Sequence, residues 1–373
     1  MNTDNTLDHR IAIVHEWLVS YAGSERCVES FTNIWKDAEV YALVDFLNKE
    51  HREIILKGKK ANTTFIQHLP FARKRHRYYL PLFPSAIERL NLSDYEVIIS
   101  SNHAVSKGVR TKKNQLHISY CHSPMRYAWD QAEHYLTGIK GSFAKAFMNY
   151  LRNWDLKSAE NVNYFIANSN HIAEKIKRIY KRDSTVIYPP VDVNKFEISE
   201  KKDDYYLIAS RFVPYKKVDL VVEAFNQMPD KKLLVIGSGP EKEKVKSIAK
   251  PNIEFLPHQE FAQLKEFMKK AKAFVFAAEE DFGITVVEAM ACGTPVIALN
   301  KGGTAESVIN GKTGILFNEQ SPESIRDAIK EFEKRIDFFD IKFIREHSEK
   351  FNRINFEENI KQFVSDKLGN FNP

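Results

Sequence analysis

The sequence predicts an α/β fold in which two doubly wound, Rossmann-like domains face a central cleft. Short apolar runs alternate with helix-like stretches along the whole chain, and this alternation starts again after Pro189-Pro190. The length of 373 residues is sufficient for two domains of ordinary size. A cleft between two such domains is the first place to expect a ligand.

In the first half of the chain, apolar runs bounded by polar residues predict buried strands. These expected strands are residues 10–16, 97–100, 116–120, 164–167 and 186–188. A helix is expected from about Gly23 to Trp35, and another ends at Tyr180 after a cap at Ser169 or Asn170. Pro189-Pro190 cannot continue a helix, so we expect the chain to pass from the first domain to the second at these residues.

The second half repeats the pattern and ends in helix. Its expected strands are residues 205–210, 232–236, 253–256, 273–278 and 295–298, and a helix is expected over 218–228. The last forty residues are helical and charged in pattern. We therefore expect one domain over residues 1–187, a second over 188–345, and a terminal helix over 346–373.

Composition is that of a soluble globular protein, with 43% hydrophobic and 28% charged residues. No apolar run approaches the ~20 residues of a membrane span, and the polar, acidic N-terminus does not resemble a signal peptide. Cys27, Cys121 and Cys292 are few and widely spaced, which favours buried free thiols in a reducing cytoplasm. No Cys/His cluster has the spacing of a metal site.

Positive charge is concentrated in one segment, although the net charge is only +6. Arg73, Lys74, Arg75 and Arg77 lie between aromatic residues at positions 71 and 83. Such a segment could bind nucleic acid or lie on an anionic membrane surface. The alternative is an ordinary solvated basic loop.

Two carboxylates follow the apolar run 273–278. Glu280 and Glu288 are expected around a strand-to-helix turn, at the sheet edge where α/β proteins bind ligands. A preference of helix N-termini for acids would explain Glu280, but not Glu288 within an apolar run. If the intervening chain were helical, the pair would span about 12 Å. Two acids so placed suggest a ligand rich in hydroxyl groups.

Cations follow the strand expected at 205–210. Arg211 and either Lys216 or Lys217 precede a helix, where they suit a phosphate group. The alternative is a charged loop with no ligand. Gly237 and Gly239 suggest a dinucleotide-binding turn, but Lys242 stands where the third glycine is needed, so a tight turn is favoured.

Two further candidates lie in the first half. Gly23 follows the first strand and would let a ligand approach the start of a helix. His122 lies in the motif YCHSPMRYAWD (120–130), at the end of a strand, where it could donate to a sugar hydroxyl. A lone glycine is more often only a turn, and a lone histidine is more often structural than catalytic.

These motifs together resemble a known family. The chain is similar to the retaining glycosyltransferases of family 4, which have the two-domain GT-B fold, and the motif at 120–130 is most similar to bacterial mannosyltransferases of O-antigen and other surface polysaccharides. The segments that carry the resemblance are EEDFGITVVEAMACGTPVIALNKGGTAE (279–306), SRFVPYKK (210–217), IYPPVD (187–192), ANSNHIAEKI (167–176) and YCHSPMRYAWD (120–130).

The resemblance implies roles for residues near the two acids. Glu280 would contact hydroxyls of the donor sugar, helped by backbone amides near Phe282, Gly283 and Ile284. Glu288 would bind the ribose of the same nucleotide.

The resemblance also implies where the diphosphate lies. Arg211 and Lys216 would neutralise it, although the neighbouring Lys217 fits as well. His122 would reach the donor sugar from the N-terminal domain, and Gly23 would line the diphosphate side.

The chain departs from the family pattern at two positions. Ala22 replaces a glycine of the first loop, and Asp281 stands where many relatives have proline. The first departure can shift the loop without removing its backbone donors.

The implied activity is transfer of mannose from GDP-mannose to a lipid-linked oligosaccharide or polysaccharide in bacterial lipopolysaccharide synthesis. The first domain would bind the acceptor, the second would bind the nucleotide sugar, and the last helix would return to the first. The enzyme would be cytoplasmic and peripheral on the inner membrane face. Because Arg211, Lys216 and a helix N-terminus can stabilise the leaving group, we expect no metal and no cofactor, and no nucleic-acid partner.

Three alternatives remain open at this point. A UDP-sugar, with glucose or N-acetylglucosamine, could be the donor. A catalytically silent sugar-nucleotide-binding assembly protein is less favoured, since it would not need the whole set of acids and cations. A nicotinamide-dependent oxidoreductase is least favoured, because the glycine fingerprint is incomplete.

Overall fold

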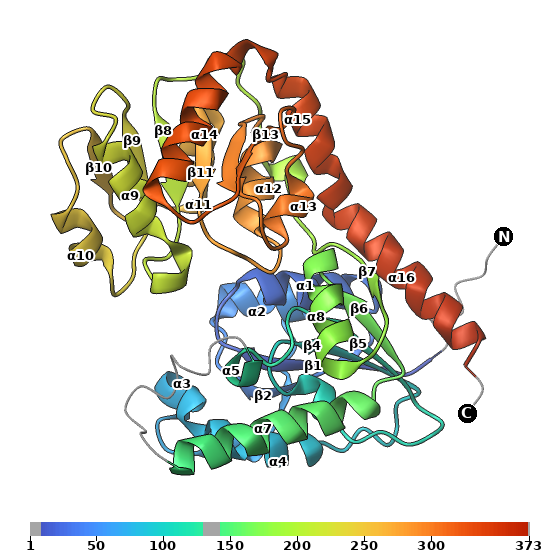
Figure 1. Ribbon diagram of the computed structural model, residues 1–373. Coiled ribbons are helices and arrows are strands. Elements are labelled where there is room, and N and C mark those ends of the chain that lie inside the picture. Colours follow the sequence, from blue (N-terminus) through green and yellow to red (C-terminus); the bar gives the residue numbers. More distant parts are fainter. Residues whose placement is uncertain (1–8, 130–141, 372–373) are drawn as a thin grey trace. The chain divides into compact units, whose positions relative to one another are not determined.

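The computed structural model describes residues 9–129 and 142–371 and divides into two compact α/β units (Figure 1). The first unit comprises Met1–Pro190 and Ile354–Pro373, and the second comprises Val191–Arg353. Each unit contains one parallel sheet flanked by helices, so the predicted pair of α/β domains is confirmed. The N-terminal segment 1–5 and Asp130 of the 120–130 motif lie outside the described residues.

The domain boundaries differ from the predicted ones by three and eight residues. Residues 188–190 group with the first unit, where the Ile187 N–H donates to the Ala167 carbonyl (3.0 Å). Residues 346–353 group with the second unit, because His347 Nε2 lies 2.7 Å from the Ser307 carbonyl oxygen. The returning helix therefore begins later than residue 346.

The sheet of the first unit has seven parallel strands. In spatial order they are β3 (Asn62–Thr63), β2 (Glu39–Asp45), β1 (Ile11–Leu18), β4 (Val97–Asn102), β5 (Leu116–Cys121), β6 (Tyr164–Ala167) and β7 (Ser184–Val186). The strand order reverses between β1 and β4. In open parallel sheets, such a reversal marks the crevice where ligands bind.

Both faces of this sheet are covered, which explains the continuous apolar strands. Alternate residues point to opposite faces, so Ile11 and Ile13 pack with α1 (Gly23–Ile34), while Ala12 and Val14 join the cluster formed with α4 (Phe83–Glu88) and α7 (Ser142–Glu160). Helix α2 (Lys49–Leu56) packs beside α1.

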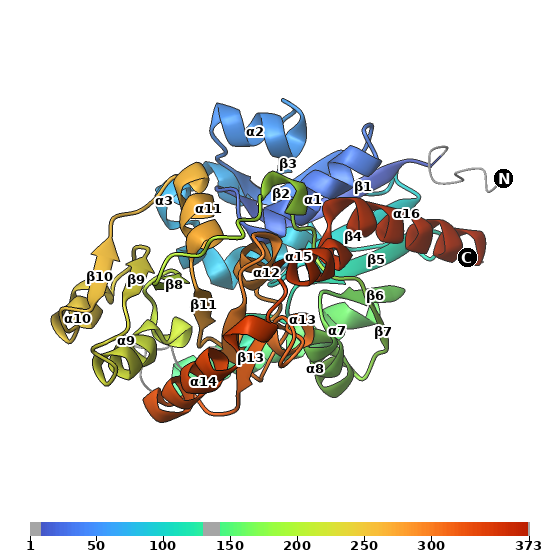
Figure 2. The ribbon, with the colours of Figure 1, turned by 90° about the horizontal axis from the view of Figure 1, so that it is seen from above.

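The last helix, α16 (Arg353–Gly369), supplies core residues to the first unit. Phe356, Ile360 and Val364 belong to the same buried cluster as the α1 side chains, and the Phe356 ring lies 5.5 Å from that of Tyr120. Figure 2 shows α16 beside α1 and across β4 and β5. A helix from the end of the chain thus completes the core of the first unit.

Helix α8 (Asn170–Tyr180) settles the question of which residue caps it. The Ser169 hydroxyl accepts a hydrogen bond from the Ile172 N–H (3.1 Å), so Ser169 is the N-cap.

The sheet of the second unit has six parallel strands. In spatial order they are β10 (Ile253–Leu256), β9 (Leu233–Ile236), β8 (Tyr206–Ala209), β11 (Ala273–Phe276), β12 (Val296–Leu299) and β13 (Gly314–Phe317). Here the strand order reverses between β8 and β11. Helices α9 (Val218–Asn226) and α14 (Pro322–Lys334) pack together, and α12 (Ile284–Ala291) packs with α15 (Ile341–Ser348). Helices α10 (Lys242–Ser247) and α11 (Phe261–Lys270) flank β10 in the chain.

Three strands were missed and one was misplaced. Strands β2, β3 and β13 were not predicted, and the strand expected at residues 186–188 lies at Ser184–Val186. Strand β13 opens with Gly314, where a Cβ would lie only 1.9 Å from the Val296 carbonyl oxygen. Glycine is more typical of turns than of strands, so a glycine that close strand packing requires hides the strand in the sequence.

One buried carboxylate organises the turn after β4. Glu16, at 0% exposure near the end of β1, accepts hydrogen bonds from four successive backbone N–H groups, those of residues 103–106, at 2.8–3.1 Å. A carboxylate that accepts several N–H bonds compensates for the cost of its burial.

We predict that Glu16→Ala destabilises the first unit by about 3 kcal/mol, because it leaves buried N–H groups unpaired. Urea unfolding followed by tryptophan fluorescence measures this unit, since all four tryptophans (17, 35, 129 and 154) belong to it. The exposed Glu358→Ala in α16 is the control and should change stability by less than about 0.5 kcal/mol. Equal stability of the two variants would contradict the role of Glu16.

Candidate functional site

In the second unit, predicted site residues meet at the carboxyl ends of β8 and β11. The strand order reverses between these two strands, which is where open parallel sheets bind ligands. Lys216 ends a short 3₁₀ turn, η5 (Pro214–Lys216), after β8, and Glu280 follows β11. Both residues were predicted from the sequence.

Lys216 and Glu280 form an ion pair across this reversal. The Lys216 ammonium donates to Glu280 Oε1, and each side chain is 19% exposed. The ammonium also lies 5.6 Å and 5.7 Å from the ring centroids of Tyr215 and Phe276. The structure thus brings together the cation that was predicted to bind phosphate and the acid that was predicted to bind sugar.

Two glycines hold the backbone of Glu280 in place. The Gly303 N–H donates to the Glu280 carbonyl (2.8 Å), and Gly302 forms a parallel bridge with Glu280. At Gly302, φ is +69° and a Cβ would lie 2.4 Å from the Glu280 carbonyl oxygen. Only glycine allows this close approach of the two loops.

The separation of Glu280 and Glu288 requires a correction. The sequence estimate of about 12 Å assumed helix throughout, but α12 begins only at Ile284, after Gly283 with φ +88°. Glu280 lies in a bridge outside the helix, whereas Glu288 lies within it and is buried. Phe282 is also buried. The two acids therefore sit in different local structures.

The remaining cations differ in their surroundings. Arg211 is exposed, and within the part of the chain that the structure describes its side chain makes no hydrogen bond or ion pair. Lys217 adopts a left-handed conformation (φ 54°) between η5 and α9. Lys216, not Lys217, is the lysine that contacts Glu280.

The Gly237–Gly239 turn is explained by packing. Cβ atoms at Gly237 and Gly239 would lie 1.9 Å from the Ser210 carbonyl oxygen and 2.4 Å from that of Phe212. These glycines let the loops after β8 and β9 approach each other, which is consistent with the tight turn favoured from the sequence.

In the first unit, His122 and Gly23 lie near the carboxyl edge of the other sheet. His122 directly follows β5 and is buried, and its Nε2 lies 2.9 Å from Ser101 Oγ. Burial, together with the neighbouring His103, His15 and Arg126, holds the pKa of His122 well below its ordinary value, so this imidazole is neutral. Gly23 is the first residue of α1.

Sequence reasoning missed the groups that surround His122. His15 Nδ1 lies 3.1 Å from the same Ser101 hydroxyl, and His15 Nε2 lies 3.6 Å from Glu25 Oε1. The signal was present in the strands, since apolar residues at alternate positions of β1 and β4 give way to His15 and Ser101 at the carboxyl edge.

In the second unit, Thr304 was missed as well. Its buried hydroxyl has no hydrogen-bond partner among residues 9–129 and 142–371.

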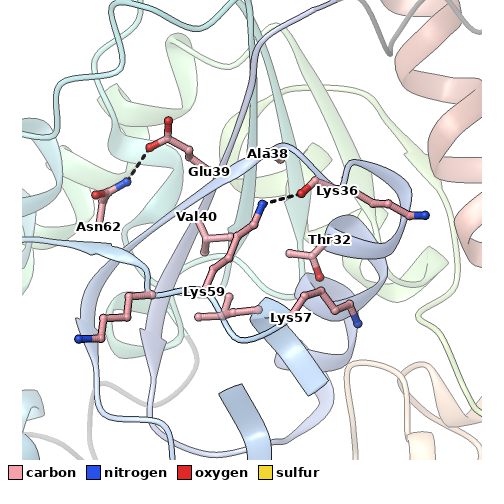
Figure 3. Close-up of a pocket in the computed structure, with 10 residues that line it drawn as sticks. Thr32, Lys36, Ala38, Glu39, Val40, Lys57, Lys59 and Asn62 are labelled. Atoms are coloured by element: carbon pink, nitrogen blue, oxygen red, sulfur yellow. Dashed lines mark hydrogen bonds between the residues drawn. The ribbon is translucent and has the colours of Figure 1, made fainter. Parts of the chain in front are cut away.

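A cavity of about 190 Å³ lies at the opposite, amino-terminal edge of the first sheet (Figure 3). Its lining residues are Thr32, Lys36, Ala38, Glu39, Val40, Leu56, Lys57, Lys59, Lys60 and Asn62. The Lys59 ammonium donates to the Lys36 carbonyl (2.7 Å), and Asn62 donates to Glu39 (3.0 Å). This cavity contains none of the predicted site residues.

Metal-binding clusters and membrane-spanning helices are both absent from the described ranges, 9–129 and 142–371. No group of three or more His, Cys, Asp and Glu side chains there is placed to hold a metal ion. No helix in those ranges is both long and apolar enough to cross a bilayer. The three cysteines are free and buried, as predicted.

Both halves of the chain match models of glycosyltransferase families. Residues 21–195 match Glycosyltransferase Family 4, and residues 192–338 match Glycosyl transferases group 1. Together the two matches run from residue 21 to residue 338. The chain therefore belongs to the group 1, family 4 glycosyltransferases.

The curated relatives match over part of their length. An uncharacterized glycosyltransferase of Methanocaldococcus jannaschii is 34% identical over 178 residues, which are 46% of this chain and 50% of the relative. A D-inositol 3-phosphate glycosyltransferase of Mycobacteroides abscessus is 28% identical over 198 residues, 46% of this chain and 44% of the relative. The chain spans about half the length of the curated relatives it matches.

Solved structures match over nearly the whole chain. Anabaena HepE in complex with UDP superposes with a TM-score of 0.71 at 18% identity, covering 96% of this chain and all of HepE. Sucrose-phosphate synthase of Thermosynechococcus elongatus superposes with a TM-score of 0.71 at 20% identity and the same coverage. At these identities the likeness shows the fold, which is the two-domain GT-B fold.

We predict that Glu280→Gln tightens the binding of inorganic pyrophosphate about 5-fold, because it removes a negative charge and frees the Lys216 ammonium. Titration calorimetry measures the affinity. Lys216→Met should abolish the gain when combined with Glu280→Gln. Glu254→Gln is the control, since this half-exposed acid pairs with Lys232 and lies on the edge strand β10, two strands away from β8. Equal affinities for Glu280→Gln and the unmodified protein would show that Lys216 does not bind the anion.

Proposed function

We propose that this protein is a retaining glycosyltransferase that transfers mannose from GDP-mannose to a lipid-linked glycan in bacterial surface-polysaccharide synthesis. The observation that carries the proposal is the Lys216–Glu280 pair at the switch point of the second sheet, in a chain of this family. One group suits a diphosphate and the other suits sugar hydroxyls, so a nucleotide sugar is the ligand that uses both.

The proposed chemistry follows from charge. When the anomeric C–O bond breaks, negative charge develops on the departing diphosphate, and the cations Arg211 and Lys216 stabilise it. Glu280 and the amides of Phe282, Gly283 and Ile284 orient the sugar. On the nucleotide side, Glu288 binds the ribose. These groups supply the charge that a metal supplies in other transferases, so the proposed reaction needs no metal ion.

A second donor is favoured by a specific observation. Anabaena HepE, which shares the fold, binds UDP, and another of its structures contains UDP-glucose. Uracil and guanine can both be held by backbone groups, so a UDP-sugar is the second candidate for this chain.

We predict that GDP-mannose raises the melting temperature more than UDP-glucose or UDP-N-acetylglucosamine, because a ligand stabilises the state that binds it. Glu288→Ala should weaken binding of the donor 10- to 100-fold through the loss of charged hydrogen bonds, while Arg211→Ala should chiefly lower turnover, about 100-fold. Thermal-shift titration and donor-turnover assays in EDTA provide the measurements.

Lys246→Ala, an exposed cation of α10, is the matched control for Arg211→Ala and should keep full turnover. Unchanged kinetics in both site variants would contradict the site. Loss of turnover in EDTA that Mg²⁺ restores would contradict the metal-independent reaction. A larger rise in melting temperature with a UDP-sugar than with GDP-mannose would favour the UDP-sugar as the donor.

The proposed acceptor is lipid-linked because one surface of the first unit suits a membrane. Phe71 and Tyr78 are 77% and 75% exposed, and Phe71 adopts a left-handed backbone conformation (φ 58°). The basic residues around them, Arg73, Lys74, Arg75 and Arg77, are also exposed. They lie in α3 (Ala72–Arg75) and the 3₁₀ turn η2 (His76–Leu82). Exposed aromatics beside clustered cations are typical of an interface with anionic lipid.

We predict that the triple variant Arg73→Glu, Arg75→Glu, Arg77→Glu lowers partitioning onto anionic liposomes by at least about 100-fold, at about 1 kcal/mol for each charge. Liposome sedimentation with and without anionic lipid measures this. The triple variant Lys57→Glu, Lys59→Glu, Lys60→Glu is the control, because it changes the net charge equally on another exposed surface of the same unit. Equal losses in the two variants would mean that net charge, not this surface, determines binding.

A further inference from the structure

On one face of the first sheet, the alternate residues of three neighbouring strands are apolar at first and become polar near His122. Neighbouring strands are in register, so that Ile11, Ile13 and His15 of β1 lie beside Val97, Ile99 and Ser101 of β4. Strand β5 adds Leu116, Ile118 and Tyr120, and His122 follows. Along each strand the residues change from apolar at the amino edge of the sheet to polar at the carboxyl edge. The strand order reverses at this edge between β1 and β4.

The Ser101 hydroxyl lies between two buried imidazoles. Its oxygen is 3.1 Å from His15 Nδ1 and 2.9 Å from His122 Nε2, and both His15 and Ser101 have no exposed surface. A hydroxyl has a single proton to donate, so it can donate to only one of the two rings and must accept from the other. The proton positions on the two histidines are therefore coupled through Ser101.

Glu25 determines the direction of this coupling. Burial alone would raise the pKa of Glu25, but His15 and the Ser24 hydroxyl hold it below its ordinary value, so the group is a carboxylate. Glu25 Oε2 accepts from the Ala22 N–H (3.2 Å) and the Ser24 hydroxyl (3.0 Å), while Oε1 faces His15 Nε2 at 3.6 Å. A negative charge facing Nε2 favours a proton on that nitrogen.

When His15 is neutral and carries its proton on Nε2, the other bonds follow in turn. Its Nδ1 then accepts from the Ser101 hydroxyl, and Ser101 Oγ accepts from His122 Nε2–H. Other charged and titratable groups around the cluster are His103 after β4, Arg126 of α5 (Arg126–Trp129), Arg77 of η2 and Glu16 of β1. The two arginines oppose a further positive charge here. Burial and nearby charges, including those of both arginines, lower the pKa of His103 to about 3.

We propose that His15 and Ser101 are positioning residues that hold His122 as the Nε2–H tautomer, with Nδ1 as a hydrogen-bond acceptor for a hydroxyl of the substrate sugar. The role toward sugar rests on the proposed function, whereas the tautomer does not. Among the residues that the structure describes, His122 Nδ1 makes no hydrogen bond, so it is available to a ligand. An acceptor at this point selects a group that donates, such as a hydroxyl, and it excludes a group that can only accept, such as a carboxylate.

Long-range ¹H–¹⁵N NMR on protein labelled with ¹⁵N-histidine tests the tautomer, with His122→Gln to assign the signal. At pH 7.5 the full-length protein should show His122 protonated at Nε2 and unprotonated at Nδ1. Ser101→Ala should give a mixture of the two tautomers, and Ser101→Thr, which keeps the hydroxyl, should restore the single one. Ser119→Ala is the control, since the buried Ser119 hydroxyl has no partner among the described residues and should leave the signal unchanged.

Glu25→Gln provides a second variant if Ser101→Ala does not fold. It removes the charge that places the proton on His15, so the His122 tautomer should change through two intervening groups. A purely structural role for the bonds would not produce that shift. A proton on Nδ1 in the unmodified protein, or an unchanged His122 signal in both Ser101→Ala and Glu25→Gln, would overturn the proposal.

Turnover separates this inference from the proposed function. With the nucleotide sugar that gives turnover, Ser101→Ala should lower kcat/KM about 10-fold and Ser101→Thr should recover most of it, corresponding to the loss of about one hydrogen bond. Unchanged kcat/KM in Ser101→Ala would overturn the role toward substrate. If the tautomer is as expected but no nucleotide sugar gives turnover, the proposed function is wrong and the coupling of the two histidines stands.

Discussion

The bonds from the Glu16 carboxylate to four backbone amides are the constraint on which the site of the first unit depends. They fix the turn that follows β4, and that turn is tied back to the strand, since the Ser106 hydroxyl donates to the Ser101 carbonyl (2.9 Å). The Asn102 carbonyl in turn accepts the His122 N–H (2.8 Å). The position of His122 thus depends, through three short steps, on one buried charge.

The two units place polar pairs at equivalent points of their sheets. His15 and Ser101 lie on β1 and β4, and Lys216 and Glu280 follow β8 and β11, so each pair spans the reversal of strand order in its own sheet. The physical reason is the same in both units. Neighbouring loops that leave in opposite directions expose the strand ends, and polar side chains can stay there without breaking the apolar core.

Sequence patterns predicted the fold well because parallel strands buried on both faces have apolar sequences, as at Leu233–Ile236 and Ala273–Phe276. They failed at β13, where Gly314 is needed for close packing, and in the spacing of the two acids, because Gly283 delays the helix. Lys216 and Glu280 were recognised from their positions after strands. Ser101 was not recognised, because the side chains beside a serine in a strand can be identified only when the register of the strands is known.

The return of α16 means that the second unit is inserted within the first. Its two ends are fastened together, since the Arg353 N–H donates to the Val191 carbonyl (3.0 Å) and the Arg353 guanidinium pairs with Asp192. The core around Phe31 and Tyr120 lacks Phe356 until the end of the chain has been synthesised. On the ribosome, all residues of the second unit are therefore synthesised before the last helix of the first unit. The first unit begins to be synthesised first but is completed last.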